Sequence, residues 1–282
     1  MSPIDLHTHS TRSDGVLTPA ELVRDAAAVG VRLLALTDHD TLAGVRDLRA
    51  TGLPAGLELL AGVEINTLTS TAAPVEGEFH VLGLGVDVTS EPFEAVLRGQ
   101  RDERRLRFER TIARLSEIGL PVDPAAAAEI VAGSQDDALG RPTIARLLVR
   151  AGHASSVQDA FSRLVGRGCP AYVPRGGLGP GEAIRAIRAA GGLPALAHFS
   201  EAPGRLAVVR ELVELGLGGL EVYYRGWDQP TVSAMRAVAD ELGLVATGGS
   251  DYHGDTGTYA EAHAGLWVPP DVAAGLGVTL ST

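Results

Sequence analysis

The chain has 282 residues, of which 45% are hydrophobic, a formal net charge of −11 and one cysteine, Cys169. This length is enough for one large domain or for a barrel with an insertion, and a single cysteine excludes an internal disulfide. The acidic balance argues against a non-specific nucleic-acid coat, but not against a small phosphorylated substrate. Because we find neither an apolar leader nor a run of about 18 apolar residues, we expect a cytoplasmic protein without a membrane anchor.

Short apolar runs alternate with amphipathic stretches over most of the chain. After a first strand that ends at His7 and His9, the sequence predicts buried strands at residues 33–36, 59–63, 81–84, 193–197, 220–223 and 244–247. Helical patterns occupy residues 19–29, 181–190, 205–215 and 231–242. Such alternation indicates βα units and a parallel sheet, so the expected fold class is α/β.

Residues 91–175 differ from both flanks. Their apolar pattern is helical, strand signals nearly vanish, and the glycine-rich residues 175–181 follow as a flexible return. We predict that residues 91–175 form a helical subdomain, inserted between the fourth and fifth strands and lying over the active site as a partial lid. Residues 1–90 and 176–282 would then form the main domain.

Residues 98–114 carry seven arginines against three acidic residues. This basic stretch could guide a nucleotide or an RNA end toward a site. The alternative is a solvated helix whose Phe108, Ile112 and Leu115 face the core at i, i+4 and i+7, and we favour that interpretation.

Six of the eight histidines stand at or just beyond the ends of the apolar runs. His7 and His9 are two residues apart, so in a strand they point to the same face with their Cα atoms roughly 6–7 Å apart, close enough to share a metal ion. Asp251 and His253 repeat this spacing near the other end of the chain. Because α/β enzymes place their chemistry at the carboxyl ends of strands, this pattern indicates a metal site.

Several segments resemble the motifs of the PHP (polymerase and histidinol phosphatase) superfamily. They are Asp5-Leu6-His7-Thr8-His9-Ser10, Ser13-Asp14-Gly15, Thr37-Asp38-His39-Asp40, Gly62-Val63-Glu64, Ala197-His198 and Gly249-Ser250-Asp251-Tyr252-His253. The resemblance covers the whole chain and implies a distorted (β/α)7 barrel with an inserted helical subdomain. Residues 140–146 and 170–174 are similar to the stand-alone branch, which removes phosphate from nucleoside 3',5'-bisphosphates or trims short RNA from its 5' end.

The resemblance also implies a metal-dependent phosphoesterase with two or three divalent ions. Imidazole and carboxylate ligands without thiolates suit Mn²⁺, Fe²⁺ or Zn²⁺. By analogy, one metal would be held by His7, His9, Glu64 and Asp251, the second by Asp14, His39 and His253, and the third by Glu64, His80 and His198. Of these residues, Glu64, Asp251 and His198 are also the expected catalytic residues. Asp5 and Asp38 are candidates for orienting the ligands, and Asp38 is equally a candidate cap of the turn that follows it.

All 24 basic residues are arginine. Metal-dependent amidohydrolases also begin with a His-x-His strand, but many bridge two metals with a carbamylated lysine, which this chain cannot supply. Glu64 is therefore the natural bridging carboxylate, which favours hydrolysis of a phosphomonoester. The partner expected is a small phosphorylated substrate, a nucleotide or short RNA, and no obligate protein partner is implied. A histidinol-phosphate phosphatase and a non-catalytic metal-binding module remain alternatives.

Arg141 is the predicted substrate contact, because a guanidinium matches a phosphate in a bidentate manner. A structural salt bridge is an equally good explanation of this residue. Two positions depart from the pattern of the branch: Thr143 stands where histidine is usual, and Phe199 follows His198 where proline is common. The first change removes any phosphate contact or proton role made by that imidazole.

Overall fold

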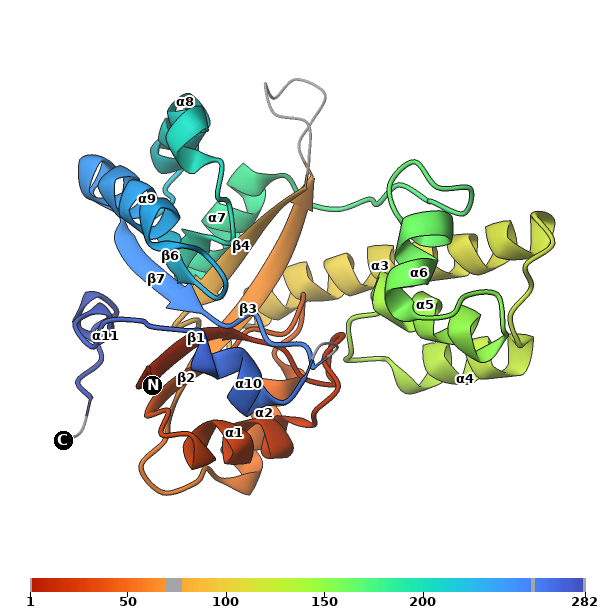
Figure 1. Cartoon of the computed structure of the whole chain (residues 1–282), viewed down its shortest axis with the longest axis horizontal. Helices are drawn as coiled ribbons and strands as arrows, with labels where there is room; N and C mark the ends of the chain where they lie inside the picture. Colours follow the sequence, from red (N-terminus) through yellow and green to blue (C-terminus); the bar gives the residue numbers. More distant parts are fainter. Residues whose placement is uncertain (1, 69–77, 255–256, 281–282) are drawn as a thin grey trace.

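The structure is a computed structural model that describes residues 2–68, 78–254 and 257–280. Seven strands form one sheet in chain order: β1 (Ile4–Thr8), β2 (Leu33–Leu36), β3 (Glu58–Leu68), β4 (Glu78–Leu84), β5 (Leu193–Leu196), β6 (Gly219–Tyr224) and β7 (Val245–Gly249). Residues that follow β7 return to β1, because the Asp251 amide donates to the His7 carbonyl at 2.8 Å. The sheet is thus a nearly closed barrel (Figure 1), and the expected distorted (β/α)7 fold is confirmed.

One strand runs against the expected parallel order. β4 pairs antiparallel with both β3 and β5, whereas all the other neighbours are parallel. Only residues 69–77, which lie outside the described residues, connect β3 to β4, and a parallel crossover needs a dozen or more residues. The reversal places the start of β4, with His80, at the barrel end where the other strands finish.

Helices cover the outside of this barrel (Figure 1): α1 (Pro19–Ala28), α2 (Ala43–Thr51), α7 (Pro180–Ala189), the short 3₁₀ turn η2 (Ala202–Arg205), α8 (Leu206–Glu214) and α9 (Gln229–Leu242). After β7 come the short helices α10 (Tyr259–Ala264) and α11 (Val272–Gly275). Helix α1 begins with a capping box, in which Thr18 accepts from the Glu21 amide and Glu21 accepts from the Thr18 amide. Apolar side chains such as Leu22, Val63 and Ile184 fill the layer between helices and sheet.

A second apolar core lies between β4 and β5 in the chain. It is built by α3 (Glu91–Glu117), α4 (Pro124–Gly133), α5 (Arg141–Arg150), α6 (Val157–Ala160) and the π-helical turn η1 (Phe161–Val165). Phe108, Leu115, Ile144 and Leu148 are buried in this core, and in Figure 1 helices α4, α5 and α6 lie along the outer half of α3. On this basis we propose residues 91–175 as the subdomain, with the boundaries expected from the sequence.

The basic stretch on α3 does not behave as a purely solvated face. Phe108 and Leu115 face the apolar core as expected, but Arg101 and Arg104 are also buried, with exposed fractions of 3% and 7%. Both belong to the half of α3 nearest the barrel, where the Arg101 guanidinium donates to the Asp40 carbonyl at 3.0 Å. The favoured interpretation of this stretch is therefore wrong for Arg101 and Arg104, which point into the protein.

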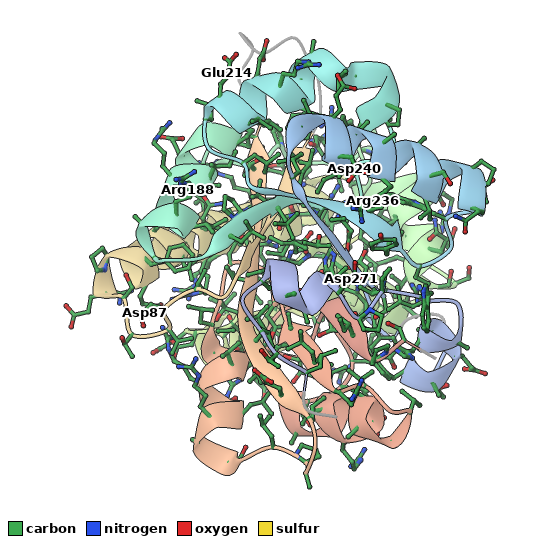
Figure 2. The ribbon with its side chains drawn as sticks, turned by 90° about the vertical axis from the view of Figure 1, so that its left-hand side faces the viewer. Asp87, Arg188, Glu214, Arg236, Asp240 and Asp271 are labelled. Atoms are coloured by element: carbon green, nitrogen blue, oxygen red, sulfur yellow. The ribbon has the colours of Figure 1, made fainter. Side chains whose placement is uncertain are left out.

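The outer helices carry charged side chains on their exposed face. Figure 2 labels Arg188, Glu214, Arg236 and Asp240 on this face, and Arg236 pairs with Asp240 one turn along α9 at 2.9 Å. Within the described ranges, no helix is long and apolar enough to cross a membrane.

Candidate metal centre

Nine imidazole and carboxylate side chains converge at one end of the barrel. They come from β1, β3 and β4 and from the segments that follow β1, β2, β5 and β7, and fall into three groups whose ligand atoms lie within 4.8 Å of one another: His7, His9 and Asp251; His9, Asp14, His39 and His253; Glu64, His80 and His198. All nine residues expected as ligands from the sequence are thus brought together. His9 lies in two groups and links them.

Glu64 belongs to the third group, but its two oxygens face different sets of imidazoles. Its Oε2 is 3.2 Å from His9 Nε2 and 2.9 Å from His39 Nδ1. Its Oε1 is 2.7 Å from His80 Nδ1 and 3.3 Å from His198 Nε2. This arrangement suits a carboxylate that bridges two cations, because each oxygen is directed at a separate set of imidazoles.

Buried atoms without hydrogen bonds show that the cluster fits a metal. They are His7 Nε2, both ring nitrogens of His9, His39 Nδ1, Asp14 Oδ1 and Glu64 Oε2. A buried polar atom without a partner is costly, so several such atoms gathered in one cluster imply a ligand there. Nitrogen and oxygen donors of this kind suit Mn²⁺, Fe²⁺ or Zn²⁺.

Three residues at this end of the barrel have left-handed backbone conformations. The φ angles are +49° for Asp40, +32° for His198 and +49° for Asp251, and among the described residues these are the non-glycine positions with positive φ. Such conformations are strained for residues with a Cβ and cluster at functional sites. They turn the ends of β5 and β7 so that His198 and Asp251 reach the cluster.

Charges within the cluster favour ionised carboxylates. Burial opposes ionisation of Glu64, but His39, His80 and His7 together hold the pKa of its carboxyl well below the usual range. Burial also lowers the pKa of His39 to about 4, despite the neighbouring Glu64 and Asp14, so this imidazole is neutral at pH 7. Neutral His39 and ionised Glu64 are thus in the forms that bind metals.

One carboxylate that the sequence analysis did not single out supports two candidate ligands. Glu221 lies fully buried in β6, where its Oε1 is 3.0 Å from His7 Nδ1 and its Oε2 accepts from the His198 amide at 2.7 Å. The sequence could have identified Glu221, because this residue interrupts an apolar strand, where an unpaired carboxylate is costly. Metal-binding histidines usually donate their second ring N–H to such a group, which fixes the tautomer.

The two aspartates expected to orient ligands act on the backbone and on loops. Asp5 accepts from the His7 amide at 3.3 Å and from the Ser250 amide at 2.9 Å, which ties β1 to the end of β7. Asp38 reaches back to the Ser10 amide and hydroxyl, both at 2.7 Å, and thereby holds the loop that carries Asp14.

A cavity of about 200 Å³ opens beside the cluster. Asp14, His39 and His80 form its inner wall, and its remaining walls include four arginines, Arg104, Arg107, Arg141 and Arg175. Arg141, which the sequence predicts as a substrate contact, lines this cavity. The other three arginines were not singled out, although two of them belong to the basic stretch on α3.

A buried aspartate positions two of these arginines. Asp40 Oδ2 accepts from Arg104 Nε at 2.5 Å and from Arg175 Nη2 at 2.8 Å. Burial opposes ionisation of Asp40, but Arg104 and Arg175 keep its pKa below the ordinary value. The two guanidinium groups are thus held side by side, although α3 and the return segment after residue 174 are far apart in sequence.

The two departures from the motif pattern lie away from these walls. Thr143 is half-buried on the first turn of α5 and does not line the cavity. Phe199 packs edge-on against Phe79, with ring centroids 5.3 Å apart.

Comparisons with known proteins agree with this site. The chain is 35% identical over 254 residues to a 5'-3' exoribonuclease of Haemophilus influenzae, covering 88% of this chain and 89% of that one. It is 31% identical over 266 residues to a 3',5'-nucleoside bisphosphate phosphatase of Chromobacterium violaceum, covering 90% and 88%. A crystal structure from Bifidobacterium adolescentis, provisionally described as a metal-dependent phosphoesterase, has a TM-score of 0.84 and 29% identity and covers 97% of this chain and 94% of that one.

The fold, the ligand cluster and these similarities define an enzyme of the metal-dependent phosphoesterase class. The PHP domain profile matches residues 5–117. The chain belongs to the PHP family, and the resemblance found in the sequence is confirmed.

Proposed function

We propose that the protein hydrolyses the phosphate ester of a nucleotide that carries a second phosphate, as in a nucleoside 3',5'-bisphosphate or at the 5' end of short RNA. The observation that carries this proposal is the arginine-lined cavity that opens directly onto Asp14, His39 and His80. Guanidinium groups are the preferred partners of phosphates, and the cavity is small enough to suit a phosphate rather than a base. Relatives named for activities on bisphosphates and RNA support the same substrate class.

The reacting phosphate would lie over the ligand cluster, with His7, His9, Asp14, His39, Glu64, His80, His198, Asp251 and His253 holding two or three Mn²⁺, Fe²⁺ or Zn²⁺ ions. Such ions lower the pKa of water to about 7 and neutralise the oxygens of the phosphoryl group. Glu64, with one oxygen toward each set of imidazoles, keeps the two sets at a constant separation. Asp251 Oδ2 accepts from the Tyr224 hydroxyl at 2.9 Å, which orients this carboxylate.

The second phosphate would bind in the cavity and position the first. Binding energy from a group that does not react is useful when it holds the reacting group in place, so it should raise kcat/KM. Histidinol phosphate, the alternative substrate, has one phosphate and a cationic amine, and four arginines beside the metal centre would repel that amine. The cavity therefore favours the bisphosphate.

A phosphate-release assay with added Mn²⁺ tests the proposal on adenosine 3',5'-bisphosphate, adenosine 3'-monophosphate and histidinol phosphate. We expect the bisphosphate to have the highest kcat/KM. Arg141→Ala should lower kcat/KM for the bisphosphate by a factor that corresponds to about 1.5–3 kcal/mol of transition-state stabilisation, the value of a charge-assisted hydrogen bond. The same variant should affect kcat/KM for the monophosphate much less. Arg150→Ala, at the exposed end of the same helix, is the matched control.

Equal losses on both nucleotides in Arg141→Ala would place this residue at the reacting phosphate or in the scaffold. Preferred hydrolysis of histidinol phosphate by the wild-type protein would overturn the proposed substrate class.

A further inference from the structure

A second cavity reaches the candidate ligands from another side. It measures about 660 Å³ and touches Asp14, Asp251 and His253, whereas the arginine-lined cavity touches Asp14, His39 and His80. This volume falls within the range of about 300–1,000 Å³ that is usual for pockets that bind small molecules.

The two cavities are neighbours, because Asp14, Pro142 and Phe161 line both of them. Asp14, a candidate metal ligand, is therefore within reach of a ligand in either cavity. The arginine-lined cavity, at about 200 Å³, has no room for a polynucleotide chain, and the larger one has room for a nucleotide.

Arg225 is the one arginine among the described residues that line the larger cavity. It follows β6, and its backbone amide donates to the Gly249 carbonyl at 3.2 Å, which ties it to the end of β7. The acidic residues of this wall, Asp14 and Asp251, are candidate metal ligands, so their charges would be balanced by the bound ions. Arg225 then offers positive charge for an anion that lies beyond the metal centre.

We propose that the larger cavity is the subsite for the nucleotide downstream of the reacting phosphate, with Arg225 binding the next phosphate of the chain. The ligand is a 5'-phosphorylated oligonucleotide that extends through both cavities. This inference rests on the proposed function, since it needs the 5'-phosphate in the arginine-lined cavity.

The reaction for such a substrate parallels that for the bisphosphate. The oxygen of a water molecule forms a bond to phosphorus, the bond between phosphorus and the 3'-oxygen of the first nucleotide breaks, and that oxygen takes up a proton. The first nucleotide leaves with its 5'-phosphate and a 3'-hydroxyl. The downstream chain keeps the reacting phosphate as a new 5'-phosphate, and it is this chain that the larger cavity holds.

Kinetics on two substrates test this subsite: adenosine 3',5'-bisphosphate and a 5'-phosphorylated adenosine trinucleotide, both with Mn²⁺. Arg225→Ala should lower kcat/KM for the trinucleotide roughly 10–100-fold, mainly through KM, and at least about tenfold more than for the bisphosphate. The plot of log kcat/KM against log salt should lose about one unit of slope for the trinucleotide, which loss of a structural contact would not cause. Arg225→Lys should restore part of both effects.

Arg210→Ala is the matched control, because it removes the same charge from the outer helix α8. Equal losses on both substrates in Arg225→Ala, or no loss on either, would overturn the subsite. Wild-type cleavage of the trinucleotide more than about 100-fold slower than that of the bisphosphate would do the same. If the wild-type protein hydrolyses neither the bisphosphate nor the trinucleotide, the proposed function itself fails, and the subsite fails with it.

Discussion

Glu221 shows how a single carboxylate supports the candidate metal centre. Its two oxygens accept from the His7 ring and from the His198 amide, so one side chain serves two strands. A glutamine in its place could accept one of these hydrogen bonds, but its amide nitrogen would face the other donor. At this position only a carboxylate can accept both hydrogen bonds, and an amide of the same size cannot.

We expect Glu221→Gln to weaken metal binding about 10–100-fold, the usual effect of removing a group that orients a ligand. The measurement is a metal titration of the apoprotein with Mn²⁺ or Zn²⁺ in competition with a chelator, with circular dichroism as a check on folding. Glu214→Gln, on the exposed side of α8 (Figure 2), is the control. Unchanged affinity in a folded Glu221→Gln protein would mean that this carboxylate does not orient the ligands.

At the scale of elements, one ion-pair network joins the helical segment to the barrel. Glu94, in the first turn of α3, accepts from Arg46 of α2 at 2.5 Å and from Arg101 of α3 at 2.6 Å. Arg101 in turn donates to the Asp40 carbonyl, next to the candidate ligand His39. The network thus anchors the first turns of α3. Farther along this helix, Arg104 and Arg107 line the cavity.

This network should contribute stability that depends on pH. Burial opposes ionisation of Glu94, but hydrogen bonds from Arg101 and Arg46 keep its pKa below the ordinary value of 4.5. A pKa that is lower in the folded state stabilises the fold above the unfolded value, and the contribution is lost as the pH falls through the folded pKa. The loss should therefore occur below pH 4.5.

We expect Glu94→Gln to reduce the free energy of unfolding at pH 7 by about 1–2 kcal/mol, because Glu94 is partly exposed and its ion pairs are screened. Urea denaturation of the wild-type and variant proteins at several pH values measures this difference, which should shrink below pH 4.5. Glu91→Gln, at an exposed position of the same helical turn, should have little effect. A difference that stays constant down to pH 3 would contradict the assignment.

At the scale of the whole molecule, the candidate ligands tie distant parts of the chain together. They come from segments between His7 and His253, so an ion held by them binds the folded state far better than the unfolded chain. Metal binding should therefore stabilise the barrel as a unit.

We expect the purified protein to contain two or three transition-metal ions per chain by elemental analysis. Removal of the metal with a chelator should lower Tm by roughly 5–10 °C, the shift expected for a domain of this size if metal is present at about 100 times its Kd, and added Mn²⁺ or Zn²⁺ should restore it. Fewer than one ion per chain after reconstitution, or a Tm that does not change with chelation, would contradict the metal centre.

Much of this architecture could be predicted from the sequence because it depends on local patterns. Residues 33–36 were expected as a strand and form β2, and α1 begins at Pro19 as expected, since apolar periodicity and end signals are properties of short segments. The candidate ligands could be identified because they stand at the ends of those segments. Helix α2 was not predicted, and its first residue follows Leu42, which offers no side-chain cap.

Only the tertiary structure decided which residues meet. The place of His80 beside His198 depends on the pairing of β4 with β5, whose residues are distant in sequence. The burial of Arg104 depends on Asp40, which follows another strand, so an isolated helical pattern could not distinguish this arginine from its solvated neighbours. The sequence by itself determined the elements and the candidate ligands, because both depend on residue type and short spacing. The cavities and the place of Arg225 in the wall of one of them were decided by contacts between segments far apart in the chain.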